Sequence, residues 1–250
     1  MTEKIDKYKV QAALVRSFFD AFSHGVIESQ VEDRKEKTTP QSVKKLMLEH
    51  YEHIAPAFFD IMFFPLAAMN YKYEEIAALA REAQQRGDDM MALVRTACGN
   101  EAYYNAMVEE YKRNFSMLLA GKYLSNADHL EGYVRKAKEE TEVSVDSDCA
   151  IELTVRVVMF AYVRGLRQTG EGARFDRSVH LRQVHPLRGA TLFRLMLDAM
   201  NILLLDEAVD FADAEAADLA SLFLKVCQTQ HNFTVMTNEM DRTYSELMKE

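Results

Sequence analysis

Apolar residues recur at alternating spacings of three and four in the first part of the chain. The positions are Ile5, Tyr8, Ala12, Val15, Phe19, Phe22 and Val26. This spacing places them on one face of a helix. The polar stretch 28–38 that follows predicts a linker, and Thr39 before Pro40 has the pattern of a helix N-terminus.

Pro56 and Pro65 enclose a run of large apolar residues. Proline removes a backbone donor and collides with the preceding turn, so we expect the chain to break or kink on either side of 57–64. The apolar side chains of this run point in every direction on a helix, which predicts burial nearly all round. They are Phe58, Phe59, Ile61, Met62, Phe63 and Phe64.

Further along, caps and apolar stripes predict helices over 73–86, up to Ala97, 100–120, 125–140, 187–209, 213–226 and 233–247. The segment 151–163 fits two structures. Its first residues alternate apolar and polar, which is a strand period, but the apolar run is too long for an ordinary strand. We favour a helix there. The acidic stretch 139–148 reads as a loop.

These elements predict the fold class all-α. We expect one domain over 1–250, a single helical bundle of about ten helices with one long irregular loop near 165–186. Only 9 Gly and 4 Pro occur among 250 residues, which favours long helices. We find no internal repeat.

Charge and cysteine content restrict the function. The formal net charge is −9, which argues against nucleic acid as a partner because such domains usually carry a basic excess. Three cysteines without a CxxC pair indicate a reducing compartment, so we expect a cytoplasmic protein. The start of the chain lacks a signal-peptide core, and the apolar segment 55–71 is too short to predict a membrane span.

Residues that could carry chemistry form few complete patterns. His50 and His53 share a helix face, but no third ligand accompanies them and no ExxH, HExxH or HxxxH motif occurs. We therefore predict no metal site and no cofactor. The acids of 206–210 resemble a magnesium-binding cluster without its companion motif, and nucleophilic catalysis has no signature.

The strongest charge asymmetry lies between Arg164 and Arg194, where seven arginines accompany two acids. Arginine grips carboxylate or phosphate with two hydrogen bonds. The predicted anion- or partner-binding residues are Arg174, Arg177, His180, Arg182, His185 and Arg188. An equal alternative is that this arginine window pairs with the acids of 206–218.

The interior is rich in flexible apolar side chains, with 14 Met and 14 Phe and no Trp. Such residues suit adaptable apolar sites, although a stripe at helical spacing more often packs in the core. The predicted apolar pocket consists of Phe58, Phe59, Met62, Phe63 and Met69.

These patterns lead to one main functional expectation. We expect a non-catalytic binding or regulatory protein for a small apolar or anionic ligand or a partner protein. The alternative is a helical enzyme that acts on an anionic, partly apolar substrate with a divalent metal. The apolar seams over 5–26 and 233–247 lie near the two chain ends, which predicts a homodimer that uses at least one of them.

Overall fold

A computed structural model describes residues 3–31, 44–45, 48–120, 144–167, 190–205 and 219–249. Within these ranges the chain forms nine helices and two short strands. In order they are β1 (Lys4–Asp6), α1 (Lys7–Val31), α3 (Tyr51–Ala68), α4 (Tyr73–Arg86), α5 (Met90–Ala97), α6 (Glu101–Ala120), β2 (Ser144–Asp146), α8 (Ser147–Arg167), α10 (Ala190–Leu204), α11 (Leu219–Cys227) and α12 (Gln230–Lys249). The all-α prediction is confirmed. The predicted N-terminus at Thr39, the helix over 125–140 and most of the loop near 165–186 lie outside the described residues.

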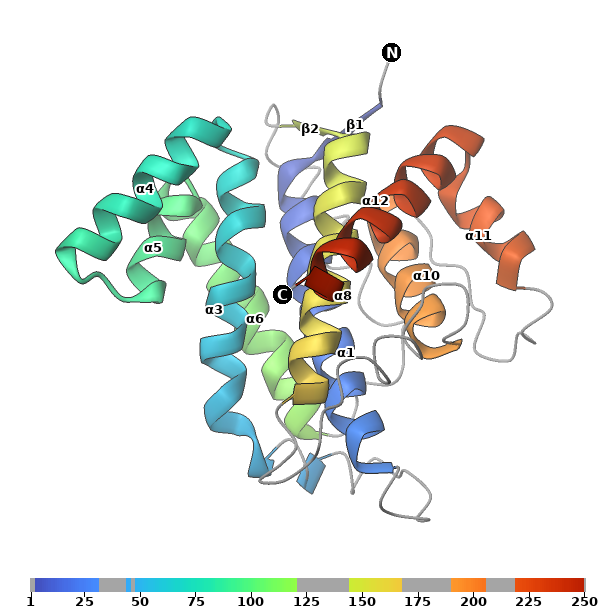
Figure 1. The fold of residues 1–250 in the computed structure, drawn as a ribbon, viewed down its shortest axis with the longest axis horizontal. Coiled ribbons are helices and arrows are strands. Elements are labelled where there is room, and N and C mark those ends of the chain that lie inside the picture. Colours follow the sequence, from blue (N-terminus) through green and yellow to red (C-terminus); the bar gives the residue numbers. More distant parts are fainter. Residues whose placement is uncertain are drawn as a thin grey trace.

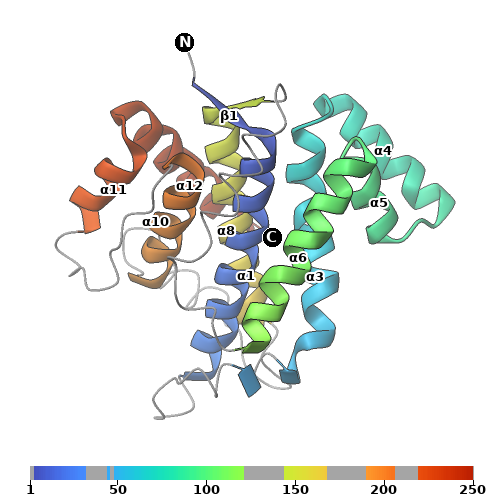
Figure 2. The ribbon, with the colours of Figure 1, turned by 180° about the vertical axis from the view of Figure 1, so that it is seen from behind.

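Two helices, α1 and α8, lie side by side at the centre of the molecule (Figure 1). Helices α3 to α6 lie on one side of this pair and α10 to α12 on the other, as the view from behind also shows (Figure 2). Every residue from Val10 to Ser23 of α1 is buried, so this helix is enclosed by its neighbours. The α1–α8 pair is therefore the centre of the core.

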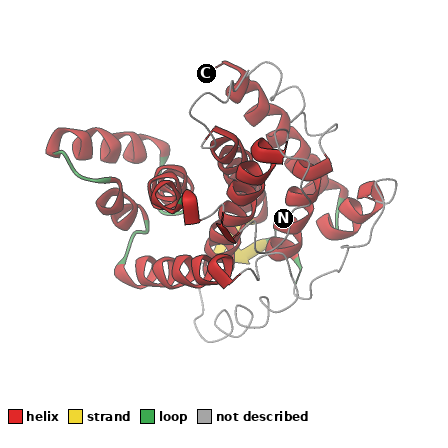
Figure 3. Ribbon diagram, turned by 90° about the horizontal axis from the view of Figure 1, so that it is seen from below, coloured by secondary structure: helices red, strands yellow, loops and turns green. Residues whose placement is uncertain are grey.

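The two strands join the starts of these central helices (Figures 1 and 3). β1 and β2 pair antiparallel, with Ile5 opposite Val145 and Lys4 opposite Asp146. Each strand leads directly into its helix, β1 into α1 and β2 into α8. Neither strand is expected from the sequence, which indicates a loop over 139–148, because three residues are too few for an alternating pattern to stand out.

The central helices also meet closely near their far ends. A Cβ added to Gly25 would stand 2.2 Å from the carbonyl oxygen of Tyr162, and one added to Gly165 would stand 2.2 Å from that of Phe22. Each glycine therefore contacts the other helix at the same relative position, 140 residues away in the sequence. Only residues without a side chain allow this approach.

The two strand–helix units, β1–α1 and β2–α8, are related by a spacing of 140 residues. Helices α6 and α12 also correspond to each other, because each carries a Glu–Arg pair at the same spacing. Glu110 pairs with Arg113 at 2.8 Å in α6, and Glu239 pairs with Arg242 at 2.6 Å in α12. The expectation of no internal repeat is thus wrong at the level of structure. In the strand–helix units the residue is identical at few positions, namely Asp6 and Asp146, Val15 and Val155, Arg16 and Arg156, Ala21 and Ala161, and Gly25 and Gly165. At several other positions one unit has a polar residue where the other has an apolar one, as at Gln11 and Ile151 or Leu14 and Thr154, which hides the repeat.

The prolines of α3 do not interrupt it. Pro56 and Pro65 both lie inside the helix, although each removes a backbone hydrogen bond. Burial of Phe58, Met62 and other residues of its inner face compensates for this loss. The expected burial all round is also wrong, because Phe64 is 37% exposed and the helix has an outer face.

Several local predictions are confirmed. The segment 151–163 is helical and forms most of α8. Helix α4 ends at Gly87, which has a φ of 70° that favours glycine. The side chain of Asn100 accepts a hydrogen bond from the backbone N–H of Tyr103 at 2.9 Å and so caps α6.

Both seams that suggested a dimer pack within the chain. Helix α1 contacts α8, α6 and α10, and α12 contacts α8. The apolar residues of the second seam are buried or half-buried, with Met236, Met240 and Leu247 at 3% exposure or less. The homodimer stays a prediction, but these seams no longer support it.

Candidate functional site

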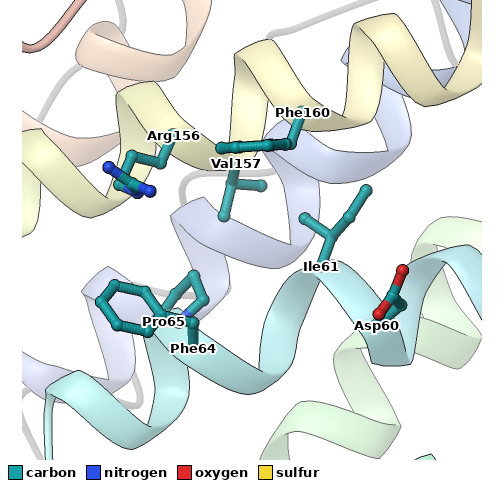
Figure 4. A pocket seen from close by; sticks show the side chains of 7 residues that line it. All are labelled: Asp60, Ile61, Phe64, Pro65, Arg156, Val157 and Phe160. Atoms are coloured by element: carbon teal, nitrogen blue, oxygen red, sulfur yellow. The ribbon is translucent and has the colours of Figure 1, made fainter. Parts of the chain in front are cut away.

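A cavity of about 240 Å³ lies between α3 and α8 (Figure 4). We call it the α3–α8 pocket. Its lining residues are Asp60, Ile61, Phe64 and Pro65 of α3 and Arg156, Val157 and Phe160 of α8. The walls are mainly apolar, and the two charged residues lie at opposite ends.

Helical spacing explains which residues of α3 reach the pocket. Phe58 and Met62 lie four residues apart and point into the core, where both are fully buried. Ile61 and Phe64 lie three residues apart on the neighbouring face, which is turned toward α8. The pocket is therefore formed by the less buried side of an apolar helix.

Arg156 forms one end of the pocket and is also bound to the C-terminal helix. Its Nη1 lies 3.3 Å from Glu239 Oε1, and its Nη2 lies 2.8 Å from Glu246 Oε2. The guanidinium stands 5.6 Å from the ring centroids of Phe64 and Phe160, within range of a cation–π interaction. Burial lowers the pKa of Arg156, but the hydrogen bond and charge of Glu246, then those of Glu239, outweigh this and raise it.

Carboxylates outnumber guanidiniums around Arg156. Glu239 is 2% exposed and also binds Arg242, and the hydroxyl of Thr243 donates to it at 3.0 Å. One turn before Arg156 lies Glu152, whose pKa is raised by burial and by the charge of Glu239. Both terminal nitrogens of Arg156 are therefore paired with carboxylates of the protein itself, and Glu152 adds a third carboxylate nearby.

Asp60 forms the other end of the pocket. Its side chain is exposed, and among the described residues it has no hydrogen bond or ion pair. A carboxylate at the rim of an apolar cavity can accept a hydrogen bond from a ligand or pair with a positive charge.

The equivalent positions on α1 are closely packed. Residues 140 positions before Arg156, Val157 and Phe160 are Arg16, Ser17 and Asp20, all at most 8% exposed. Arg16 Nε lies 3.0 Å from Asp20 Oδ2. Burial raises the pKa of Asp20, while Arg16 and His24 act in the opposite direction. The repeat therefore carries two versions of this face, one closed by a buried ion pair and one open as the α3–α8 pocket.

The residues predicted for an apolar pocket mostly pack in the core. The ring of Phe58 lies 5.1 Å from that of Phe18 and 4.7 Å from that of Tyr111, and Met62 is completely buried. Phe59, Phe63 and Met69 are half-buried. The pocket in the structure lies on the same helix as four of these residues but one face away, because the sequence does not tell which face of an all-apolar run packs inward.

The six residues of the arginine window that were predicted to bind an anion or partner lie outside the described part of the chain, as do the acids of 206–210. This applies to Arg174, Arg177, His180, Arg182, His185 and Arg188. Only Arg164, Arg167 and Arg194 of this region are described. Their role in binding stays a prediction.

His50, the N-cap residue of α3, and His53, in its first turn, have ring centroids 6.2 Å apart. Burial, followed by the charge of His53, lowers the pKa of His50. Across the described ranges, no group of three or more His, Cys, Asp or Glu residues is arranged to hold a metal ion. None of the described helices combines the length and apolarity that a bilayer crossing requires.

Comparison with protein-family models, curated proteins and solved structures finds no match to this chain. The α3–α8 pocket has a signal in the sequence, because Asp60 and Arg156 are charged residues inside apolar helical runs. Such residues need a partner or a solvent-facing position, so they mark the less buried face of a helix.

Proposed function

We propose that this is a non-catalytic, cytoplasmic binding or regulatory protein that takes a small, mainly apolar ligand in the α3–α8 pocket. The observation that carries the proposal is the cavity of about 240 Å³, with aliphatic and aromatic walls and charges only at its ends. Ligand sites commonly combine such walls with a few polar groups that orient the ligand.

The size of the pocket suits a small molecule. Its volume of about 240 Å³ is slightly below the range of ~300–1,000 Å³ for drug-sized ligands. A single aromatic ring with a short substituent is therefore an appropriate occupant, with a dissociation constant of about 1 mM for so few contacts.

Arg156 gives the pocket a connection to the rest of the molecule. It lines the pocket and at the same time holds Glu239 and Glu246 of α12. A ligand that rests against Arg156 can change how firmly α12 is held, which supports a regulatory role.

The proposal is tested with 2-phenylethanol, a neutral aromatic probe, by ligand-observed NMR. We expect saturable binding at millimolar concentration. The variant Ile61→Phe fills the pocket and should abolish binding, while Ile202→Phe enlarges a half-buried residue of α10 and serves as the matched control. Binding that is absent in the wild type, or unchanged in Ile61→Phe, would contradict the proposal.

A further inference from the structure

We propose that the α3–α8 pocket selects a small organic cation, an amine or quaternary ammonium with an aromatic or aliphatic body. This inference rests on the proposed function and names the class of its ligand. It follows from which charges around the pocket are satisfied by the protein and which are left for a ligand.

Arg156, which carries the positive charge of the pocket, is already paired with carboxylates of the protein. Both terminal nitrogens of Arg156 are bound to carboxylates of α12, at 3.3 Å and 2.8 Å. An anionic ligand would have to displace Glu246 or approach it, and Glu152 adds a further negative charge one turn away on α8. Like charges at these distances disfavour binding. The arginine therefore does not make this an anion site.

The negative charge at the other end is available. Asp60 lines the pocket and pairs with no described residue, so a ligand cation can approach its carboxylate without breaking an existing bond. Together with the excess of carboxylates around Arg156, it gives the pocket a negative balance.

The apolar walls suit the body of such a ligand. Phe64 and Phe160 already face the guanidinium of Arg156 at 5.6 Å from their centroids, so a ligand ammonium belongs at the Asp60 end and the rings contact its apolar part. A ligand ammonium beside Asp60 would have its apolar body against Ile61 and these rings (Figure 4). The pocket thus matches a molecule that is positive at one end and apolar at the other.

The expected preference is modest because Asp60 is exposed to solvent. An ion pair in water at ~4 Å is worth about 1 kcal/mol, which corresponds to a roughly five-fold change in affinity. We therefore expect 2-phenylethylammonium to bind about five-fold more tightly than 2-phenylethanol, and phenylacetate to bind most weakly. The three probes share one ring and differ mainly in charge.

The experiment compares these probes on wild type and on Asp60→Asn by NMR titration at low ionic strength. Asp60→Asn should reduce the affinity for the ammonium to that for the alcohol and leave the alcohol unchanged. Glu82→Gln, which removes an exposed carboxylate of α4, is the matched control and should change neither.

Each outcome separates this inference from the proposed function. If the ammonium and the alcohol bind equally and Asp60→Asn has no effect, the cation preference is wrong while the pocket remains a ligand site. If phenylacetate binds best, Arg156 is open to anions and the charge argument fails. If no probe binds, both proposals fail.

Discussion

Replacement of Gly25 by alanine tests the close contact between α1 and α8. The new Cβ would lie 2.2 Å from the Tyr162 carbonyl oxygen and 2.9 Å from the Leu166 backbone nitrogen. Non-bonded heavy atoms prefer separations of about 3.5 Å or more, so the helices would have to move apart by about 1 Å. Since both contacts are with backbone atoms, no side-chain rotation relieves them.

Two opposing effects set the magnitude. Overpacking in a core costs about 1–3 kcal/mol, and a backbone clash between central helices belongs at the upper end. Alanine stabilises a helix interior by about 1 kcal/mol relative to glycine. We therefore expect Gly25→Ala to lower the free energy of unfolding by about 2 kcal/mol, measured by urea denaturation with circular dichroism.

The reciprocal geometry provides a second check. Gly165→Ala should destabilise by a similar amount, because its Cβ would meet the Phe22 carbonyl oxygen at the same 2.2 Å. The double variant should cost less than the two single changes together, since one separation of the helices relieves both clashes. Ser116→Ala at an exposed position of α6 is the control for alanine itself. A Gly25→Ala variant as stable as wild type would refute the close contact.

Two further predictions concern buried charges. Glu239→Gln should cost about 3 kcal/mol of stability because it removes the buried carboxylate that pairs with the partly buried Arg156 and with the exposed Arg242. Glu246→Gln, at a carboxylate that is 41% exposed, should cost less than about 1 kcal/mol in the same denaturation assay, and equal losses would contradict this ranking. Burial raises the pKa of Asp20, so its carboxyl group binds a proton more tightly in the folded state than in the unfolded state. The free energy of unfolding of wild type, relative to that of Asp20→Asn, should therefore fall as the pH rises from about 4 through the raised pKa. A stability difference that stays constant or rises over this window, measured by urea denaturation at several pH values, would show that burial does not dominate at Asp20.

Local patterns were sufficient for most helices of the described chain. The stripe over 233–247 and the caps at Asn100 and Gly87 depend on residues within one or two turns, so they are readable from the sequence. The passage of α3 through two prolines depends instead on burial against other helices. So does the pairing of β1 with β2, which lie 140 residues apart. Contacts over such distances leave no periodic trace.

The charge of the pocket also depends on long-range contacts that leave no pattern in the sequence. Asp60 and Arg156 stand out in the sequence as charged residues within apolar helices, which marks the less buried faces of α3 and α8. The charge that each of these residues offers to a ligand depends on ion pairs that the sequence does not reveal. Glu239 and Glu246, which pair with Arg156, follow it by 83 and 90 residues. Without these carboxylates Arg156 would make the pocket an anion site. Because α12 supplies them, the unsatisfied charge is that of Asp60, and the preference of the pocket reverses in sign.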